Sequence, residues 1–314
     1  MGNKTLLALL TVATFSVNAQ TDAPNNNQFN VNTNQIAGAG GVGSVLGSFV
    51  IPPAAVGAGL PVGLENNGSG DLLVSVIGPS SFSTLDTAGN LLSGPTDIAA
   101  NTGTAIGVTT NATNLFFTDT GGIEVDIYDL SGAYQSSFDV STETTFPEGI
   151  TVAPYNGNLF VVSGSGENIV AEYDLTGAVQ NSFPVNGSSQ DGIAFDSQRC
   201  VFWMYDSGTD TVRSHNSDFT EIQTFPGSGA AGFGNAEGVA VVGNSLFLLV
   251  AGAATVVEFD IAGATVAANA GTLCNAGPAV PAVPVPFLNK QSVLLLVFMT
   301  ILSSLFFFRK SKIS

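Results

Sequence analysis

Residues 148–164 read EGITVAPYNGNLFVVSG, and this stretch decides the fold because it recurs along the chain. Related stretches are IGVTTNATNLFFTDTGG at 106–122, DGIAFDSQRCVFWMYDSG at 191–208 and EGVAVVGNSLFLLVAG at 237–252. A weaker copy begins near Gly63. The shared glycines of the five copies are Gly63, Gly107, Gly149, Gly192 and Gly238, spaced 44, 42, 43 and 46 residues apart. A period of that length is the signature of a repeat architecture.

Each module contains four short segments with the character of β-strands. The first starts at the shared glycine, and the second is an apolar run such as Leu159–Val162. The third alternates apolar and polar residues, as in Ile169–Asp174, and the fourth is more polar, as in Val179–Val185. Gly, Asn, Asp and Ser fill the turns. Four strands in about 42–46 residues indicate the blade of a β-propeller.

The start of the body predicts how the ring closes. Residues 43–50, GSVLGSFV, are similar to the fourth strands of later modules, whereas the last module has a poor fourth segment at 262–270. We therefore predict an all-β protein over residues 43–276. It is a β-propeller of five blades, each with four antiparallel strands, closed by an N-terminal strand. Six blades are the alternative, if 262–276 and 21–42 form a degenerate blade; a β-sandwich or solenoid explains the repeats less well.

The modules resemble the NHL, SMP-30/gluconolactonase-like and SdiA-regulated propellers over roughly residues 60–262. The residues that carry the resemblance are Glu148-Gly-Ile-Thr-Val, Asn158-Leu-Phe-Val-Val and Asn168-Ile-Val-Ala-Glu-Tyr-Asp. In lactonase-like and esterase-like propellers the channel mouth holds a catalytic metal, so the resemblance implies that possibility for this chain.

The N-terminus has the features of an export signal. Lys4 precedes an apolar stretch at Leu6–Phe15, and the small residues before Gln20 suit cleavage after Ala19. We expect residues 1–19 to be a signal peptide and residues 20–42 to be a disordered segment.

The C-terminus predicts a membrane anchor. A Pro-rich linker at 277–291 precedes an uncharged apolar run at 292–308, which has the minimum length of a transmembrane helix. The basic tail at 309–314 is then cytoplasmic. The arrangement resembles the PEP-CTERM and IPTL-CTERM sorting signals of bacteria, through Val283, Pro284, Pro286, Arg309 and Lys310. The resemblance implies an exosortase-type processing enzyme, with the body anchored in the cytoplasmic membrane facing the periplasm, or at the cell surface after processing.

The charge balance limits the partners. The chain has 24 acidic and 7 basic residues, and between residues 20 and 289 the basic residues are Arg199 and Arg213. Nucleic acid is excluded as a partner, because phosphate backbones are bound by clusters of Lys and Arg. A protein or a glycan at the cell surface is the partner that this charge balance favours.

Two cysteines agree with an exported chain. Cys200 and Cys274 can form one disulfide in an oxidising compartment, and two unpaired buried thiols are the alternative. Two cysteines alone do not make a structural zinc site, which takes four ligands.

Three carboxylates are the candidate site. Glu148, Asp191 and Glu237 start consecutive modules, where a propeller's inner strands open the channel, while Ile106 and Val62 hold the equivalent positions of the other two. Converging carboxylates suit Ca²⁺. The alternative is that an acid before Gly caps a turn. Lactonase-type ligand sets also include asparagines, for which Asn235 is the candidate.

The remaining candidates favour structural roles. The single histidine, His215, is expected on a surface turn, and Trp203 and Tyr205 are expected in the core. The acids that end the third strands, Asp129, Asp174 and Asp260, are expected to bond turn backbone. With no catalytic motif, a binding or structural module is the first functional hypothesis, and a Ca²⁺-dependent hydrolase of lactonase or phosphoesterase type is the alternative.

Overall fold

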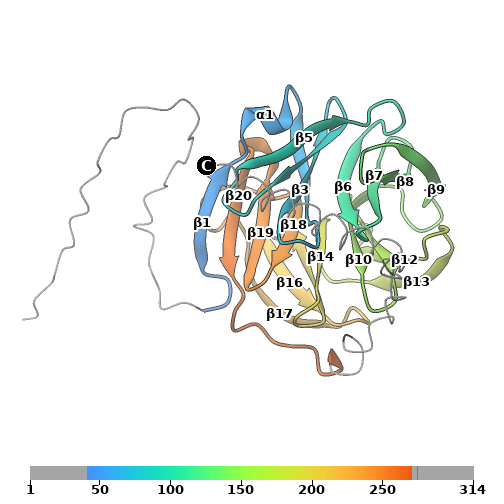
Figure 1. Ribbon diagram of the computed structural model, residues 1–314. Coiled ribbons are helices and arrows are strands. Elements are labelled where there is room, and N and C mark those ends of the chain that lie inside the picture. Colours follow the sequence, from blue (N-terminus) through green and yellow to red (C-terminus); the bar gives the residue numbers. More distant parts are fainter. Residues whose placement is uncertain (1–40, 271–273, 275–314) are drawn as a thin grey trace, which may run out of the picture.

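A computed structural model describes residues 41–270 and Cys274. Five antiparallel sheets of four strands form a ring around a central channel, which confirms the all-β, five-bladed propeller (Figure 1). The predicted signal peptide, the linker, the sorting residues, the apolar run and the basic tail lie outside the described residues, as does nearly all of 20–42. Among the residues described, no helix has the length and apolar character to cross a membrane.

The blades are numbered in chain order, each from its innermost to its outermost strand. Blade 1 contains β2 (Leu60–Asn66), β3 (Leu72–Ile77), β4 (Ser81–Leu85) and β5 (Leu91–Asp97). Blade 2 contains β6 (Ala105–Thr110), β7 (Asn114–Asp119), β8 (Glu124–Asp129) and β9 (Tyr134–Asp139). Blade 3 contains β10 (Pro147–Ala153), β11 (Asn158–Ser163), β12 (Ile169–Tyr173) and β13 (Val179–Pro184). Blade 4 contains β14 (Gln190–Asp196), β15 (Val201–Asp206), β16 (Thr211–His215) and β17 (Glu221–Pro226). Blade 5 contains β18 (Gly238–Val242), β19 (Ser245–Val250), β20 (Thr255–Asp260) and β1 (Val45–Val50).

Blade 5 is built from both ends of the body. Strand β1 pairs antiparallel with β20, with Ser48 opposite Val257, so the first strand of the chain is the outermost strand of the last blade. The six-blade alternative is wrong, because residues 262–270 contain no strand. Two short helical turns not foreseen from the sequence occur at α1 (Pro53–Val56), which connects β1 to β2, and at η1 (Ala251–Ala253).

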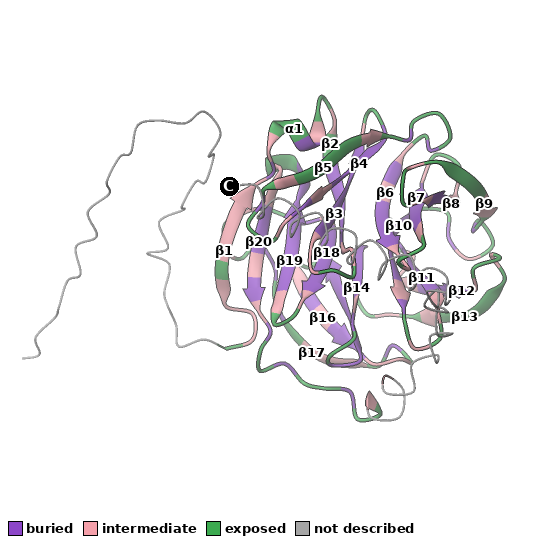
Figure 2. Ribbon diagram, viewed as in Figure 1, coloured by how far each residue is buried: buried purple, intermediate pink, exposed green. Residues whose placement is uncertain are grey.

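Burial follows the radial order of the strands. All six residues of β15 are buried. Strand β13 at the rim is almost wholly exposed (Figure 2). The core lies between neighbouring blades. Between blades 3 and 4, for example, the Phe202 ring is 4.6 Å from Phe160 and 4.7 Å from Phe219, centroid to centroid. Burial of each such side chain contributes about 2 kcal/mol, so stacking of blades, not any single sheet, stabilises the ring.

The shared glycines lie where the inner strands approach one another most closely. A Cβ atom on any of them would lie within 2.8 Å of a backbone atom in the next blade around the ring. None of these five glycines has a positive φ, so an L-residue could adopt the backbone conformation. The repeat therefore requires glycine for lack of space. The glycine and the backbone atom it faces are Gly63 and Ile106 O, Gly107 and Glu148 O, Gly149 and Ile193 N, Gly192 and Glu237 O, and Gly238 and Leu64 N.

Side-chain hydroxyls join the inner strands in two of the blades. The Ser75 hydroxyl accepts a hydrogen bond from Gly63 N at 2.9 Å and donates one to Ile106 O in blade 2. In the same way, the Thr118 hydroxyl accepts from Gly107 N at 2.7 Å and donates to a blade 3 carbonyl. These hydroxyls satisfy backbone groups at a register shift of the inner strand that would otherwise be left unpaired in the interior.

A disulfide holds the end of the described chain. Cys200 and Cys274 are bonded, with 5.8 Å between their Cα atoms and a sequence separation of 74. Ala267 N also donates to Arg199 O at 3.0 Å. The segment after β20 is thereby fastened to the turn between β14 and β15 in blade 4.

Candidate functional site

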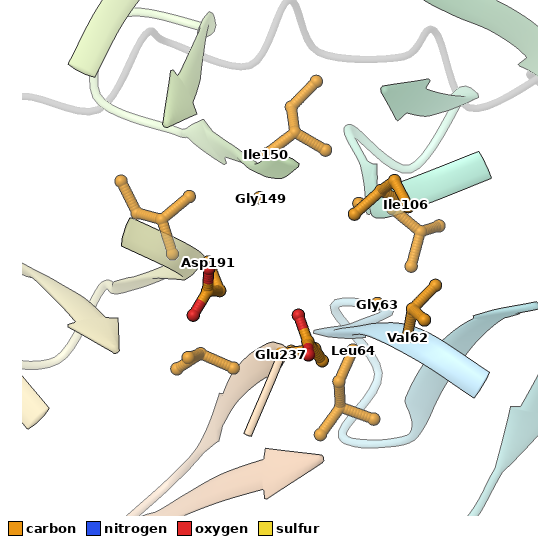
Figure 3. Close-up of a pocket in the computed structure, with 14 residues that line it drawn as sticks. Val62, Gly63, Leu64, Ile106, Gly149, Ile150, Asp191 and Glu237 are labelled. Carbon is orange, nitrogen blue, oxygen red and sulfur yellow. The ribbon is translucent and has the colours of Figure 1, made fainter. Parts of the chain in front are cut away.

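The channel mouth brings together the residues that start the modules. Asp191 and Glu237 point from β14 and the start of β18 into a pocket whose opposite side is formed by Val62 and Ile106 (Figure 3). Further aliphatic side chains line this pocket, namely those of Leu64, Val108, Ile150, Ile193 and Val239. The cavity volume is about 10 Å³. That is close to the least space that holds one water molecule, so the pocket suits a water or an ion.

Glu148 lies beside this pocket and is turned toward its own blade. Its carboxyl group occupies the space above Gly164, where a Cβ atom would be 2.6 Å from Oε2. Asp191, at the start of the next blade, is the acid whose charge acts most strongly on Glu148. The Oε2 atom of Glu148 has no hydrogen-bond partner among the described residues. Burial first, and then the neighbouring acid, raise the pKa of Glu148 far above its usual value.

The other two acids experience the same environment to smaller degrees. Asp191 accepts hydrogen bonds from Ser207 N and from the Ser189 hydroxyl, both at 3.2 Å. Burial nevertheless raises the pKa of Asp191. Burial and the Asp191 charge raise the pKa of Glu237 to about 7. The mouth therefore favours bound protons over three separate negative charges, or a cation that compensates those charges.

The three acids share one mouth without forming a compact triplet. Among the described residues, the group of three acids whose oxygens all lie within 4.8 Å of one another is Asp119, Glu124 and Asp126, in blade 2. An ion bound at the mouth would thus be held with water in part of its shell, as Ca²⁺ sites allow. The candidate Asn235 does not line this pocket; its Nδ2 donates to the carbonyl of Ser207, the residue whose N bonds Asp191, at 3.1 Å.

Glu65 is a channel residue that the sequence analysis missed. Its Oε2 accepts a hydrogen bond from the Thr151 hydroxyl at 2.8 Å, and its Oε1 accepts from Asn66 N at 2.8 Å. Because β2 and β10 belong to blades that are not neighbours, the bond to Thr151 crosses the channel. Phe195 N, in blade 4, also donates a hydrogen bond to the Thr151 hydroxyl. The repeat gave no sign of Glu65, since the equivalent positions of the other modules carry no acid: they are Thr109, Thr151, Ala194 and Ala240.

The burial of Glu65 predicts a pH dependence. Burial raises the pKa of Glu65 from 4.5 to about 8. Its folded-state pKa is raised, so its contribution to stability is complete below about pH 4.5 and is lost as the pH rises to about 8. In EDTA, we expect the melting temperature to fall between pH 5 and pH 8, and Glu65→Gln to make this fall smaller, since the amide stays neutral. Thermal melting across that range checks it.

The matched control is Glu258→Gln, a half-buried glutamate in β20 that accepts from the Ser245 hydroxyl. This substitution should leave the fall of the melting temperature between pH 5 and pH 8 as it is in the natural chain. An equal slope in Glu65→Gln and the natural chain would contradict the role given to Glu65.

The remaining sequence candidates have structural roles, with one correction. Trp203 and Tyr205 are fully buried, as expected. Asp129 Oδ1 accepts from Ser131 N at 2.9 Å and Ala133 N at 3.0 Å, as expected of a turn residue. The expectation for His215 is wrong. It ends β16 and is 1% exposed, because its ring packs toward Phe219, and burial lowers its pKa to about 4.

The fold agrees with that of solved structures. No protein-family model matches the sequence, and no curated protein matches it either. A chain of the nidogen/laminin complex is 19% identical with a TM-score of 0.51, and the match covers 67% of this chain and 78% of that one. Glutaminyl cyclase of Myxococcus xanthus is 14% identical with a TM-score of 0.54, over 70% of this chain and 97% of that one. At such identities the likeness concerns the fold alone: the body of this chain is a β-propeller.

Proposed function

We propose that this chain is an exported, anchored binding module whose channel mouth holds one divalent cation, with Ca²⁺ as the preferred ion. Glu148, Asp191 and Glu237 would supply the carboxylate oxygens. The resemblance of the modules to the NHL and SMP-30/gluconolactonase-like propellers supports a metal at this mouth. The segments at 1–19 and 277–314 support export, anchoring and processing by an exosortase-type enzyme.

One observation carries the cation. The buried Glu148 Oε2 has no hydrogen-bond partner in the described part of the chain, and it lies in a group of acids that repel one another. An uncompensated buried carboxylate is costly, and a cation removes both the missing contact and the repulsion. Neither basic residue of the described chain can do so, because Arg199 pairs with Asp196 and Arg213 pairs with Glu221.

The size of the cavity favours a binding module over a hydrolase. A volume of about 10 Å³ accommodates an ion or a water molecule, and a lactone or phosphoester would have to lie outside the mouth. We therefore propose that the ion makes the mouth rigid, and that the surface around it binds a protein or glycan at the cell surface. Ca²⁺-dependent hydrolysis stays the alternative.

Calcium should raise the melting temperature of the purified full-length chain. At a Ca²⁺ concentration about 100 times its dissociation constant, one site adds about 2.7 kcal/mol. For a body of this size that is a rise of roughly 5–10 °C, reversed by EDTA. In the double variant Glu148→Gln/Glu237→Gln, the calcium-induced rise in melting temperature should be smaller by the amount that one Ca²⁺ site contributes.

Glu258→Gln is again the control and should respond as the natural chain does. An equal response in the double variant and the natural chain would remove the ion from the mouth. Turnover of a lactone or phosphoester by the natural chain, lost in the double variant, would favour the hydrolase.

A further inference from the structure

Three acids meet at the turn between the second and third strands of blade 2. Asp119 ends β7, and Glu124 and Asp126 lie on the next strand, β8. One carboxylate oxygen of each lies within 4.8 Å of an oxygen of both others. No basic residue of the described chain pairs with them, since its two arginines form their ion pairs in blade 4. The cluster is separate from the channel acids, which start inner strands.

Asp126 carries a second and independent observation. Its side chain is fully buried, and its Oδ2 accepts from the Thr102 hydroxyl at 2.7 Å. Its Oδ1 is buried and has no hydrogen-bond partner among the described residues. Burial, reinforced by the charges of Glu124 and Asp119, raises the pKa of Asp126 to about 7. A carboxylate left in this state costs free energy that a positive charge would recover.

At the equivalent position of blade 4, the positive charge is supplied by an arginine side chain of the protein itself. Asp206 ends β15 as Asp119 ends β7, and both accept hydrogen bonds from the backbone that precedes the inner strand of their blade. Arg213 occupies the strand position that Asp126 holds in blade 2, because Met204 pairs with Arg213 as Phe117 pairs with Asp126. The Arg213 guanidinium lies 3.7 Å from Asp206. Blade 2 has a third carboxylate where blade 4 has this positive charge.

We propose that Asp119, Glu124 and Asp126 bind a divalent cation, Ca²⁺ by preference, which replaces in blade 2 the arginine of blade 4. Carboxylate oxygens are the ligands that Ca²⁺ takes, and water completes its shell. The exposed turn residues Gly121 and Gly122 lie against the carboxylates and have no side chain to crowd them. A Cβ at Gly121 would lie 3.1 Å from Asp119 Oδ1, and one at Gly122 would lie 2.6 Å from Glu124 Oε1. Of the three acids, Glu124 is partly exposed, so it is the side of the site that faces the surface.

Calcium titration by calorimetry, on the full-length chain after EDTA treatment and dialysis, tests this site separately from the channel. We expect Asp126→Asn to lose one bound Ca²⁺ per chain, and Glu124→Gln to bind that ion at least about tenfold more weakly, since one of three charged ligands is gone. Glu124 is half-buried at the surface, so its variant keeps the test valid should Asp126→Asn not fold. Glu258→Gln should bind as the natural chain does.

Terbium luminescence gives a second readout of position. The Tyr128 hydroxyl is 2.6 Å from the Thr102 hydroxyl that bonds Asp126, so excitation of tyrosine should sensitise a Tb³⁺ ion bound here. Sensitised emission should fall in Glu124→Gln and persist in Glu148→Gln/Glu237→Gln. Unchanged calcium stoichiometry and affinity in Glu124→Gln would overturn the blade 2 site. If calcium binding were lost in Glu148→Gln/Glu237→Gln but unchanged in both blade 2 variants, the blade 2 site would be overturned. The proposal of an ion at the channel mouth would then still stand.

Discussion

Gly63→Ala should lower the melting temperature of the propeller by roughly 10 °C. The added Cβ would collide with Ile106 O of blade 2 and with the Ser75 hydroxyl that links the two blades. Neither can yield, because Ile106 belongs to the inner strand of blade 2 and the Ser75 hydroxyl is hydrogen-bonded to both inner strands. Overpacking of an interior costs about 3 kcal/mol at the upper end of its usual range. For a body of this size, each kcal/mol lowers the melting temperature by about 2–4 °C.

The matched control is Gly47→Ala. Gly47 is also a strand glycine, in β1, and a Cβ there would have no atom within 4 Å. Neither position has a positive φ, so both substitutions are free of backbone strain and differ in the space available. Thermal melting of both variants should separate them clearly. Equal melting temperatures would show that the inner strands can move apart, contrary to the account of the shared glycines.

Removal of the disulfide should have an effect of similar size. The bond between Cys200 and Cys274 closes a loop across a sequence separation of 74 residues. In the chain-entropy account, a loop of that length contributes roughly 4 kcal/mol by restricting the unfolded chain. We expect Cys200→Ser/Cys274→Ser to melt roughly 10 °C below the oxidised natural chain.

A reducing agent supplies the control for this experiment. It should lower the melting temperature of the natural chain to that of the double variant, and it should not affect the variant. A variant as stable as the oxidised chain would mean that other contacts, such as the bond from Ala267 N to Arg199 O, hold the terminal segment without the disulfide.

The fold was predictable because the signals that specify it are local. The period between Gly63 and Gly238, the alternation in the third strands and the turn residues recur in each module, so each copy supports the others. The similarity of residues 43–50 to later fourth strands also predicted the closure that β1 and β20 make. The sequence did not reveal why the shared residue is glycine, because the atoms that exclude a side chain belong to the next blade.

The site was predictable in part. Position in the repeat was enough to bring Asp191 and Glu237 to one mouth, but the rotation of Glu148 toward Gly164 depends on packing within its blade. His215 was misplaced because a polar residue at the end of a short strand gives no local sign of the aromatic side chain that covers it. Glu65 was missed because its partner, Thr151, lies 86 residues away across the channel.

The sequence by itself determined the repeat, the strands and turns of each blade, and the excess of acidic residues, since these depend on neighbouring residues or on composition. The tertiary structure decided which acids meet. The register between β7 and β8 brings Asp119, Glu124 and Asp126 together. In blade 4 the position of Asp126 is taken by Arg213, whose positive charge lies near Asp206. Burial then decided their chemistry, because a carboxyl group that loses its water holds its proton more strongly or requires a cation.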